Sequence, residues 1–155
     1  MRPKTTGAPT LTVILLLAAT ALLGGCGTSV ATIDFRCGSN INGGLLLTVD
    51  VVRATEEEAR KIQELGPKWF YEPMRQSVSS RIKTVTFPAA DASTKCDREV
   101  TVPFNKGEKY LVVVADYKYE AADASRHTVV LPPEKWAGRT LLVSVQEQQL
   151  SVQTR

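Results

Sequence analysis

The sequence contains little of the chemistry that enzymes place at an active site. It has one histidine, His127, in 155 residues. It has no nucleophile elbow, no phosphate-binding glycine loop and no HExxH zinc motif. Cys37 and Cys96 are too far apart in sequence to form a local zinc knuckle, and only one histidine is present to join them. We therefore expect no catalytic residues, no bound metal and no cofactor, and we favour a binding or assembly role.

Charge is also scarce at the N-terminus, where an uncharged run from Leu11 to Leu23 follows Arg2 and Lys4. The length of this run suits the apolar region of an export signal and is short for a membrane-spanning helix. The next residues, through Cys26, complete the sequence Leu-Gly-Gly-Cys, which resembles the lipobox of bacterial lipoproteins. We expect residues 1–25 to be removed and Cys26 to carry a lipid. The alternative is a simple secretory signal with an incidental cysteine.

The residue after that cysteine is Gly27 rather than aspartate. In lipoproteins of enteric-type bacteria, the absence of aspartate at this position implies delivery to the outer membrane. We therefore expect a lipid anchor at Cys26 in the outer membrane, followed by a short tether over residues 26–32.

Little net charge remains once the signal is removed. The mature chain holds 17 basic and 16 acidic side chains, because the signal takes two of the 19 basic residues and none of the 16 acidic ones. A charge of +1 gives no electrostatic footprint for nucleic acid. No run of basic residues is present for anionic lipid, so we expect the acyl chains to do the anchoring, at roughly 0.8 kcal/mol per buried CH₂. The length indicates one domain, residues 33–155.

Two cysteines, Cys37 and Cys96, remain if Cys26 is lipidated. An even pair in an oxidising compartment suggests a disulfide. A loop of this size would contribute about 4 kcal/mol in the chain-entropy model. Two free, buried cysteines are the alternative.

Most of the mature chain has the alternation and turn spacing of short strands. The expected strands are residues 33–37, 45–54, 80–87, 98–104, 109–120, 127–131, 140–145 and 150–152. One helix is predicted from Thr55 to Leu65, with a capping box formed by Thr55 and Glu58 and a stop at Gly66. The pattern predicts a mainly β, two-sheet antiparallel sandwich with a short helical insertion after strand two.

Three adjacent aromatic residues, Trp69, Phe70 and Tyr71, follow the predicted helix. They cannot all face inward, so we expect one ring to be exposed. That ring is either incidental to core packing or part of a functional surface patch.

The order of these segments resembles the TssJ family, the outer-membrane lipoproteins of the type VI secretion system. The resemblance rests on the lipobox and on five segments of the mature chain. These are the Asn- and Gly-containing loop at 40–44, the strand Leu46 to Val52, the tyrosine-led apolar strand Lys109 to Tyr117, and the closing segments Val129 to Pro132 and Thr140 to Val145.

The resemblance implies a transthyretin-like sandwich with a structural role on the periplasmic face of the outer membrane. It also implies binding to the periplasmic domain of the large inner-membrane subunit TssM. The family's contact loop corresponds by position to Ser39, Asn40, Ile41, Asn42, Gly43 and Gly44. We expect Ile41 to be an exposed apolar anchor between two asparagines; a plain connecting turn is the alternative.

Two other functional classes stay open. One is a different envelope-assembly lipoprotein, such as a pilotin, which the gene neighbourhood would distinguish. The other is a periplasmic ligand-binding or inhibitor lipoprotein, which a deep pocket within the sandwich would favour.

Overall fold

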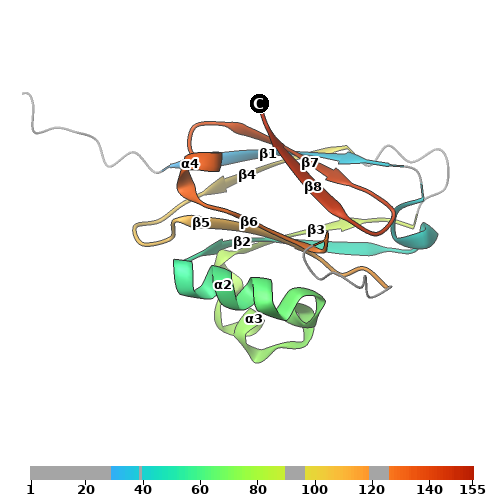
Figure 1. Ribbon diagram of the computed structural model, residues 1–155, viewed down its shortest axis with the longest axis horizontal. Helices are drawn as coiled ribbons and strands as arrows, with labels where there is room; N and C mark the ends of the chain where they lie inside the picture. The colour runs from blue at the N-terminus through green and yellow to red at the C-terminus, as the bar shows by residue number, and fades with distance from the viewer. Residues whose placement is uncertain (1–28, 39, 90–96, 119–125) are drawn as a thin grey trace, which may run out of the picture.

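The computed structural model describes residues 29–38, 40–89, 97–118 and 126–155, which form two facing β-sheets with a helical layer outside one of them (Figure 1). Three residues singled out above, Cys26, Ser39 and Cys96, lie outside the described residues, as does the predicted signal 1–25.

Each sheet has four strands. The first sheet has the order β4-β1-β7-β8, with β4 (Arg98–Pro103), β1 (Val30–Cys37), β7 (Thr140–Val145) and β8 (Leu150–Thr154). The second has the order β3-β2-β5-β6, with β3 (Ile82–Phe87), β2 (Leu47–Ala54), β5 (Tyr110–Ala115) and β6 (Thr128–Leu131). The predicted sandwich is therefore confirmed. One neighbouring pair, β1 and β7, runs parallel; these strands lie far apart in sequence, so no hairpin requires them to run antiparallel.

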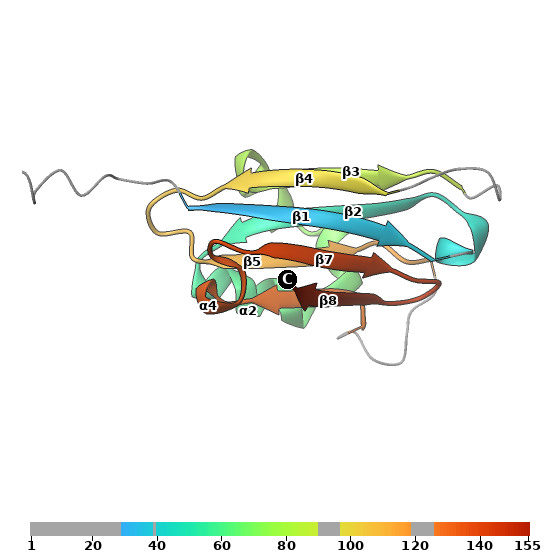
Figure 2. The same cartoon turned by 90° about the horizontal axis from the view of Figure 1, so that it is seen from above.

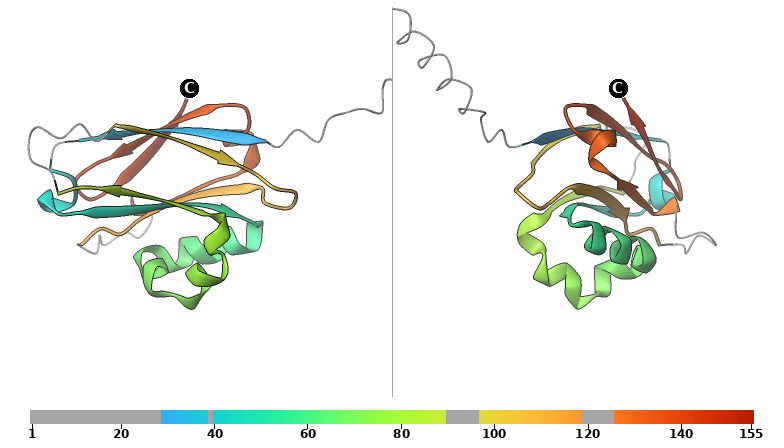
Figure 3. Two further views of the ribbon diagram at one scale, coloured as in Figure 1. Left: turned by 180° about the vertical axis from the view of Figure 1, so that it is seen from behind. Right: turned by 60° about the vertical axis from the view of Figure 1, so that its left-hand side comes forward.

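The short helices occupy the connections. They are η2 (Ile41–Gly44), α2 (Glu56–Leu65), η3 (Gly66–Tyr71), α3 (Pro73–Ser77), η4 (Ser79–Arg81) and α4 (Pro133–Trp136). The segment from α2 to η4 follows β2 directly, as predicted, and covers only the outer face of the second sheet (Figure 3). The structure has the predicted capping box at Thr55 and Glu58, and Gly66 ends α2 with a φ of 53°.

The helical layer explains why two central strands are apolar on both faces. In β5, Leu111 and Val113 enter the core between the sheets, whereas Val112 and Val114 pack under α2 and η3. Strand β2 divides its side chains in the same way. A strand that is buried on both faces has a continuous run of hydrophobic residues. The apolar run in β5 follows from its position between the first sheet and the helical layer.

A buried carboxylate fixes the helical layer to the sheet. Asp50 in β2 is fully buried and accepts hydrogen bonds from Trp69 Nε1 at 3.0 Å and from Thr84 Oγ1 at 2.7 Å. Arg75 donates to the same carboxylate from Nε at 2.7 Å and Nη2 at 3.2 Å. These hydrogen bonds with Asp50 raise the pKa of Arg75. Four donors compensate the desolvation of the charge, as a buried carboxylate requires.

Cys37 at the end of β1 is disulfide-bonded. Strand β1 pairs antiparallel with β4, and Phe35 lies opposite Arg98. An ion pair joins Arg36 to Asp97, the next residues along this register. Asp97 is adjacent in sequence to Cys96, which lies outside the described residues, so this register supports Cys96 as the partner that we propose.

The sandwich has two ends that the eight residues of β1 separate (Figure 2). We call the end where β1 begins the amino-terminal pole; it includes Ser29, residues 104–109 and residues 132–139. The other end, the loop pole, includes residues 40–46, 116–118 and 146–149. At about 3.3 Å per residue, β1 holds the two poles roughly 25 Å apart. The strand begins at Val30, earlier than predicted, because Ala31 is already fully buried.

Candidate partner-binding loop

The loop between β1 and β2 has an irregular backbone that its composition permits. Asn40 and Asn42 have φ values of 61° and 51°, and Gly43 and Gly44 have φ values of 64° and 78°. This left-handed region is strained for most residues, and glycine and asparagine enter it most readily. The asparagines and glycines that marked a turn in the sequence are therefore the residues that this conformation requires.

The structure contradicts the prediction that Ile41 is an exposed anchor. Its side chain is only 2% exposed and belongs to the core between the two sheets. The loop lies across the open end of the sandwich, where apolar side chains from both sheets would otherwise meet water. Burying an isoleucine there contributes about 1.5–3 kcal/mol. Ile41 therefore closes the core and is not available to a partner.

Asn42 holds the loop to two neighbouring segments. Its side chain is buried, with 3% exposure. The side-chain amide donates to the Leu46 carbonyl at 2.8 Å, and the side-chain oxygen accepts from the backbone N–H of Lys118 at 2.8 Å. Its own backbone N–H donates to the Glu147 carbonyl at 3.0 Å. Asn42 thus connects the loop to the end of β5 and to the β7–β8 turn.

A second set of contacts holds the β7–β8 turn in place. The Tyr117 hydroxyl lies 3.1 Å from the Gln146 carbonyl and 2.8 Å from the Gln149 carbonyl, and burial raises the pKa of Tyr117. The ring of His127 lies 4.9 Å from the Tyr117 ring. His127 is fully buried, and burial lowers its pKa. His127 is therefore neutral at pH 7 and packs beside Tyr117 at the loop pole.

The exposed apolar surface of this loop lies at Leu45 and Leu46, which are 40% and 57% exposed. The sequence pattern predicted both in strand two, but β2 begins at Leu47, which is fully buried. Two further predicted contact residues, Asn40 and Gly43, are also exposed. The side chain of Asn40 donates to Glu147 Oε1 at 3.0 Å.

Of the six residues that the resemblance assigned to the contact loop, the structure therefore places two at the surface and two in the interior. Gly44 is half-buried, and Ser39 lies outside the described residues. The leucines were missed because a run of three leucines at 45–47 does not reveal where the strand begins.

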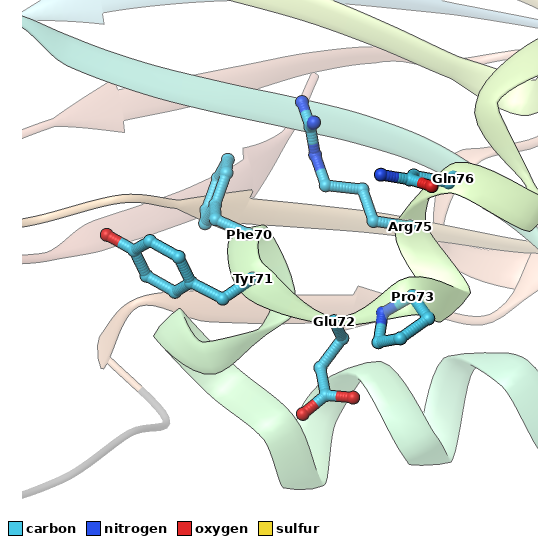
Figure 4. A pocket seen from close by; sticks show the side chains of 6 residues that line it. All are labelled: Phe70, Tyr71, Glu72, Pro73, Arg75 and Gln76. Carbon is cyan, nitrogen blue, oxygen red and sulfur yellow. The ribbon is translucent and has the colours of Figure 1, made fainter.

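The aromatic segment offers a second surface feature. Trp69 is fully buried, whereas Tyr71 is 82% exposed, which confirms that one of the three rings faces solvent. Phe70 and Arg75 point toward the strands and Tyr71 points away, around a hollow of about 160 Å³ (Figure 4). The Arg75 guanidinium lies 5.5 Å from the Phe70 ring centre. Ligand pockets usually enclose about 300 Å³ or more, so this hollow is small for such a site.

Metal-binding clusters and membrane-spanning helices are both absent from the described part of the chain. Within residues 29–38, 40–89, 97–118 and 126–155, no cluster of three or more His, Cys, Asp or Glu side chains is placed to hold a metal ion. No helix among the residues that the structure describes is both long and apolar enough to cross a membrane.

No protein-family model and no curated protein matches the sequence. Several solved structures share its fold. A chain in the structure named "Type VI membrane complex" has a TM-score of 0.65 at 16% identity, and the match covers 81% of this chain and 98% of that one. The lipoprotein TssJ1 from Pseudomonas aeruginosa has a TM-score of 0.59 at 14% identity, over 83% of this chain and 97% of that one. The chain has the TssJ fold.

A third similar chain comes from the structure named "T6SS protein TssM C-terminal domain (869-1107) from EAEC". Its TM-score is 0.64 at 16% identity, and the match covers 81% of this chain and 98% of that one. Each of the three matches covers more than four-fifths of this chain and nearly the whole of the similar chain.

Proposed function

We propose that this chain is a structural lipoprotein of the type VI secretion membrane complex. A lipid on Cys26 anchors it to the periplasmic face of the outer membrane, and it binds the periplasmic domain of a TssM-like inner-membrane protein. The observation that carries the proposal is the TssJ fold, matched over 97% of the TssJ1 chain. The Leu-Gly-Gly-Cys sequence at the end of an export signal supports it independently. The role is one of assembly, without a catalytic step.

The lengths of the matched chains support a TssM-like partner. In the structure named for the TssM domain, the match covers 81% of this chain and 98% of the similar chain. That similar chain is therefore shorter than the 155 residues of this one. The TssM domain itself, numbered 869–1107 in the same structure, is far longer. From these lengths we infer that the similar chain is a smaller component beside the TssM domain, which is the place that we propose for this protein.

The arrangement of the poles fits attachment at one end and binding at the other. The first described residue, Ser29, is three positions after Cys26, and it lies at the amino-terminal pole, where its carbonyl accepts from the Phe104 backbone N–H. The loop pole lies about 25 Å away, at the other end of β1. A lipid on Cys26 therefore directs the loop away from the outer membrane, toward a partner that approaches from the inner membrane.

We place the partner contact at Leu45 and Leu46, flanked by Asn40 and Gly43. Apolar side chains held in place before binding lose little conformational freedom when the partner covers them. The left-handed backbone and the hydrogen bonds of Asn42 provide that rigidity. Central apolar anchors of this kind often contribute about 2 kcal/mol or more to binding.

The test replaces both leucines with serine and measures affinity for the TssM-like periplasmic domain. With Leu45→Ser and Leu46→Ser, we expect binding to weaken at least tenfold, because two exposed anchors are lost. The melting temperature should change little, since both side chains already face solvent. Tyr71→Ser, at the 82% exposed ring, is the control and should bind normally.

Each alternative result has a definite meaning. If Tyr71→Ser weakens binding and the leucine variant does not, the aromatic segment is the contact surface. If the unaltered chain does not bind the TssM-like domain, the proposed partner is wrong and a pilotin-like or ligand-binding role returns to consideration.

A further inference from the structure

The amino-terminal pole is built around two stacked aromatic rings beside the attachment point of the tether. The Phe104 backbone N–H donates to the Ser29 carbonyl at 2.8 Å. The Phe104 ring stacks on Trp136, with ring centres 3.8 Å apart and planes 16° from parallel. Trp136 Nε1 donates to the Lys109 carbonyl at 3.0 Å. These contacts join the start of β1, the β4–β5 turn and α4 into one packed unit.

Four cations belong to this unit: Lys106, Lys109, Lys135 and Arg139. All four are exposed, and none forms an ion pair within the described part of the chain. The β4–β5 turn contributes two of them and the α4 segment the other two, and both segments lie at the same end of the sandwich (Figures 1 and 2). The cluster is invisible in the sequence because strands β5 and β6 lie between its two halves.

Acidic groups at this pole offset only part of the positive charge. Glu108 lies 3.5 Å from Arg53 and accepts from the Asn105 backbone N–H, so its charge is already compensated. Glu134 is exposed beside Lys135. The acidic first turn of α2 begins near Lys109, whose N–H donates to the Ala54 carbonyl at 3.0 Å. Glu134 offsets one positive charge, so the three exposed cations Lys106, Lys135 and Arg139 together keep a net positive charge.

The tether would hold this pole close to a bilayer. Ser29 is three residues after Cys26, and three extended residues reach at most about 11 Å. The Debye length at physiological ionic strength is about 8 Å. A lipid on Cys26 therefore holds the start of β1 within about 11 Å of the headgroups. This distance is of the same order as the screening length, so anionic lipid can attract cations at this pole.

We propose that the amino-terminal pole is a membrane-binding surface for anionic phospholipid headgroups, which Lys106, Lys135 and Arg139 contact. This proposal rests on the proposed function, because the lipid on Cys26 is what brings the pole to the membrane. The surface adds to the strength of the lipid anchor and also limits the orientation of the protein on the membrane. With the pole held against the bilayer, the loop at Leu45 and Leu46 points outward and is available to the partner.

The test uses the processed chain from residue 26 with Cys26→Ser, so that binding does not depend on acylation. Circular dichroism first establishes that this chain is folded. Cosedimentation is then measured with vesicles of phosphatidylcholine alone and with vesicles that contain phosphatidylcholine and phosphatidylglycerol in a molar ratio of seven to three. We expect binding to the anionic vesicles only, and we expect its loss as salt rises.

The decisive variant combines Lys106→Gln, Lys135→Gln and Arg139→Gln. Each neutralised charge should weaken binding up to roughly fivefold, so we expect the triple variant to partition at least tenfold less. The matched control, Lys61→Gln, Lys68→Gln and Lys83→Gln, removes the same charge from exposed positions elsewhere and should bind as before.

Two results would overturn the proposal: no preference for anionic vesicles, or equal losses in the two triple variants. The first would leave the acyl chains as the sole anchor, and the second would reduce the effect to net charge. Neither result bears on the TssM-like partner, whose binding is measured without membranes. Loss of partner binding with intact vesicle binding would instead contradict the proposed function alone.

Discussion

Replacing Asn42 should show how much of the loop pole depends on one buried amide. The sequence pattern predicts an exposed turn at residues 40–42, in which substitutions would leave stability nearly unchanged. The structure predicts a different result, because Ile41 and Asn42 are 2% and 3% exposed. Two substitutions, Asn42→Ala and Asn42→Gly, separate the side-chain contribution from the backbone contribution.

The expected magnitudes follow from the geometry. Both substitutions remove two side-chain hydrogen bonds of 2.8 Å, to Leu46 and Lys118. Each such bond contributes about 1 kcal/mol net, so Asn42→Gly should lower the free energy of unfolding by about 2 kcal/mol. Alanine must also adopt a φ of 51°, which costs about 1 kcal/mol more. We therefore expect Asn42→Ala to lower it by about 3 kcal/mol in total.

The assay is urea unfolding of the processed chain, followed by tryptophan fluorescence. Both tryptophans are suitable reporters because Trp69 and Trp136 are buried, in the helical layer and at the amino-terminal pole. Affinity for the TssM-like domain should be measured on the same variants. It should fall even though Asn42 is too buried to touch a partner, because the position of Leu46 depends on it.

Two outcomes would refute this reasoning. Losses below about 0.5 kcal/mol in both variants, which is the usual range for a surface substitution, would mean that the loop does not depend on these hydrogen bonds. Equal losses for alanine and glycine would mean that the left-handed backbone at residue 42 carries no measurable strain.

Three other predictions concern the cysteines and the buried histidine. Cys26→Ser should abolish acyl labelling and leave the protein unprocessed or soluble; continued labelling with outer-membrane fractionation would contradict lipidation at this residue. Thiol counting on the denatured, unreduced mature chain should find Cys37 and Cys96 joined, and their bond should contribute about 4 kcal/mol; two free thiols would exclude it. His127 is buried and its pKa is lowered, so only the unfolded chain takes up its proton as the pH falls below about 6.5, and the free energy of unfolding should decrease there. His127→Leu should remove that part of the pH dependence in urea titrations across this range.

Local patterns in the sequence were enough to predict most elements of the fold. The capping box at Thr55 and Glu58 and the stop at Gly66 mark the start and end of one helix. Alternating apolar residues located the strands, since a strand exposes every second side chain to each face. The apolar run of β5 is explained by burial on both faces, and the sequence alone did not show that a helical layer supplies the second face.

The candidate site was harder to predict, because the composition of a loop does not reveal which of its side chains are exposed. Asparagine and glycine marked the position of the loop, since they permit its left-handed backbone. They gave no information on which apolar neighbour would face inward. Ile41 closes the open end of the core, and Leu46 remains at the surface. That choice depends on the space left between two sheets whose strands come from the whole chain.

Properties that depend on neighbouring residues can be read from the sequence. The helix with its cap, the strands and the position of the turn were predicted in this way, and the export signal with its cysteine stays a prediction of the same kind. Which side chains meet across the chain depends on the complete fold. The segments that carry Lys106 and Lys135 lie at the same pole, where Phe104 stacks on Trp136, and a net charge of +1 for the mature chain does not reveal this. Charges interact over about 10 Å and burial depends on atoms in contact, and the sequence specifies such distances only through the complete fold.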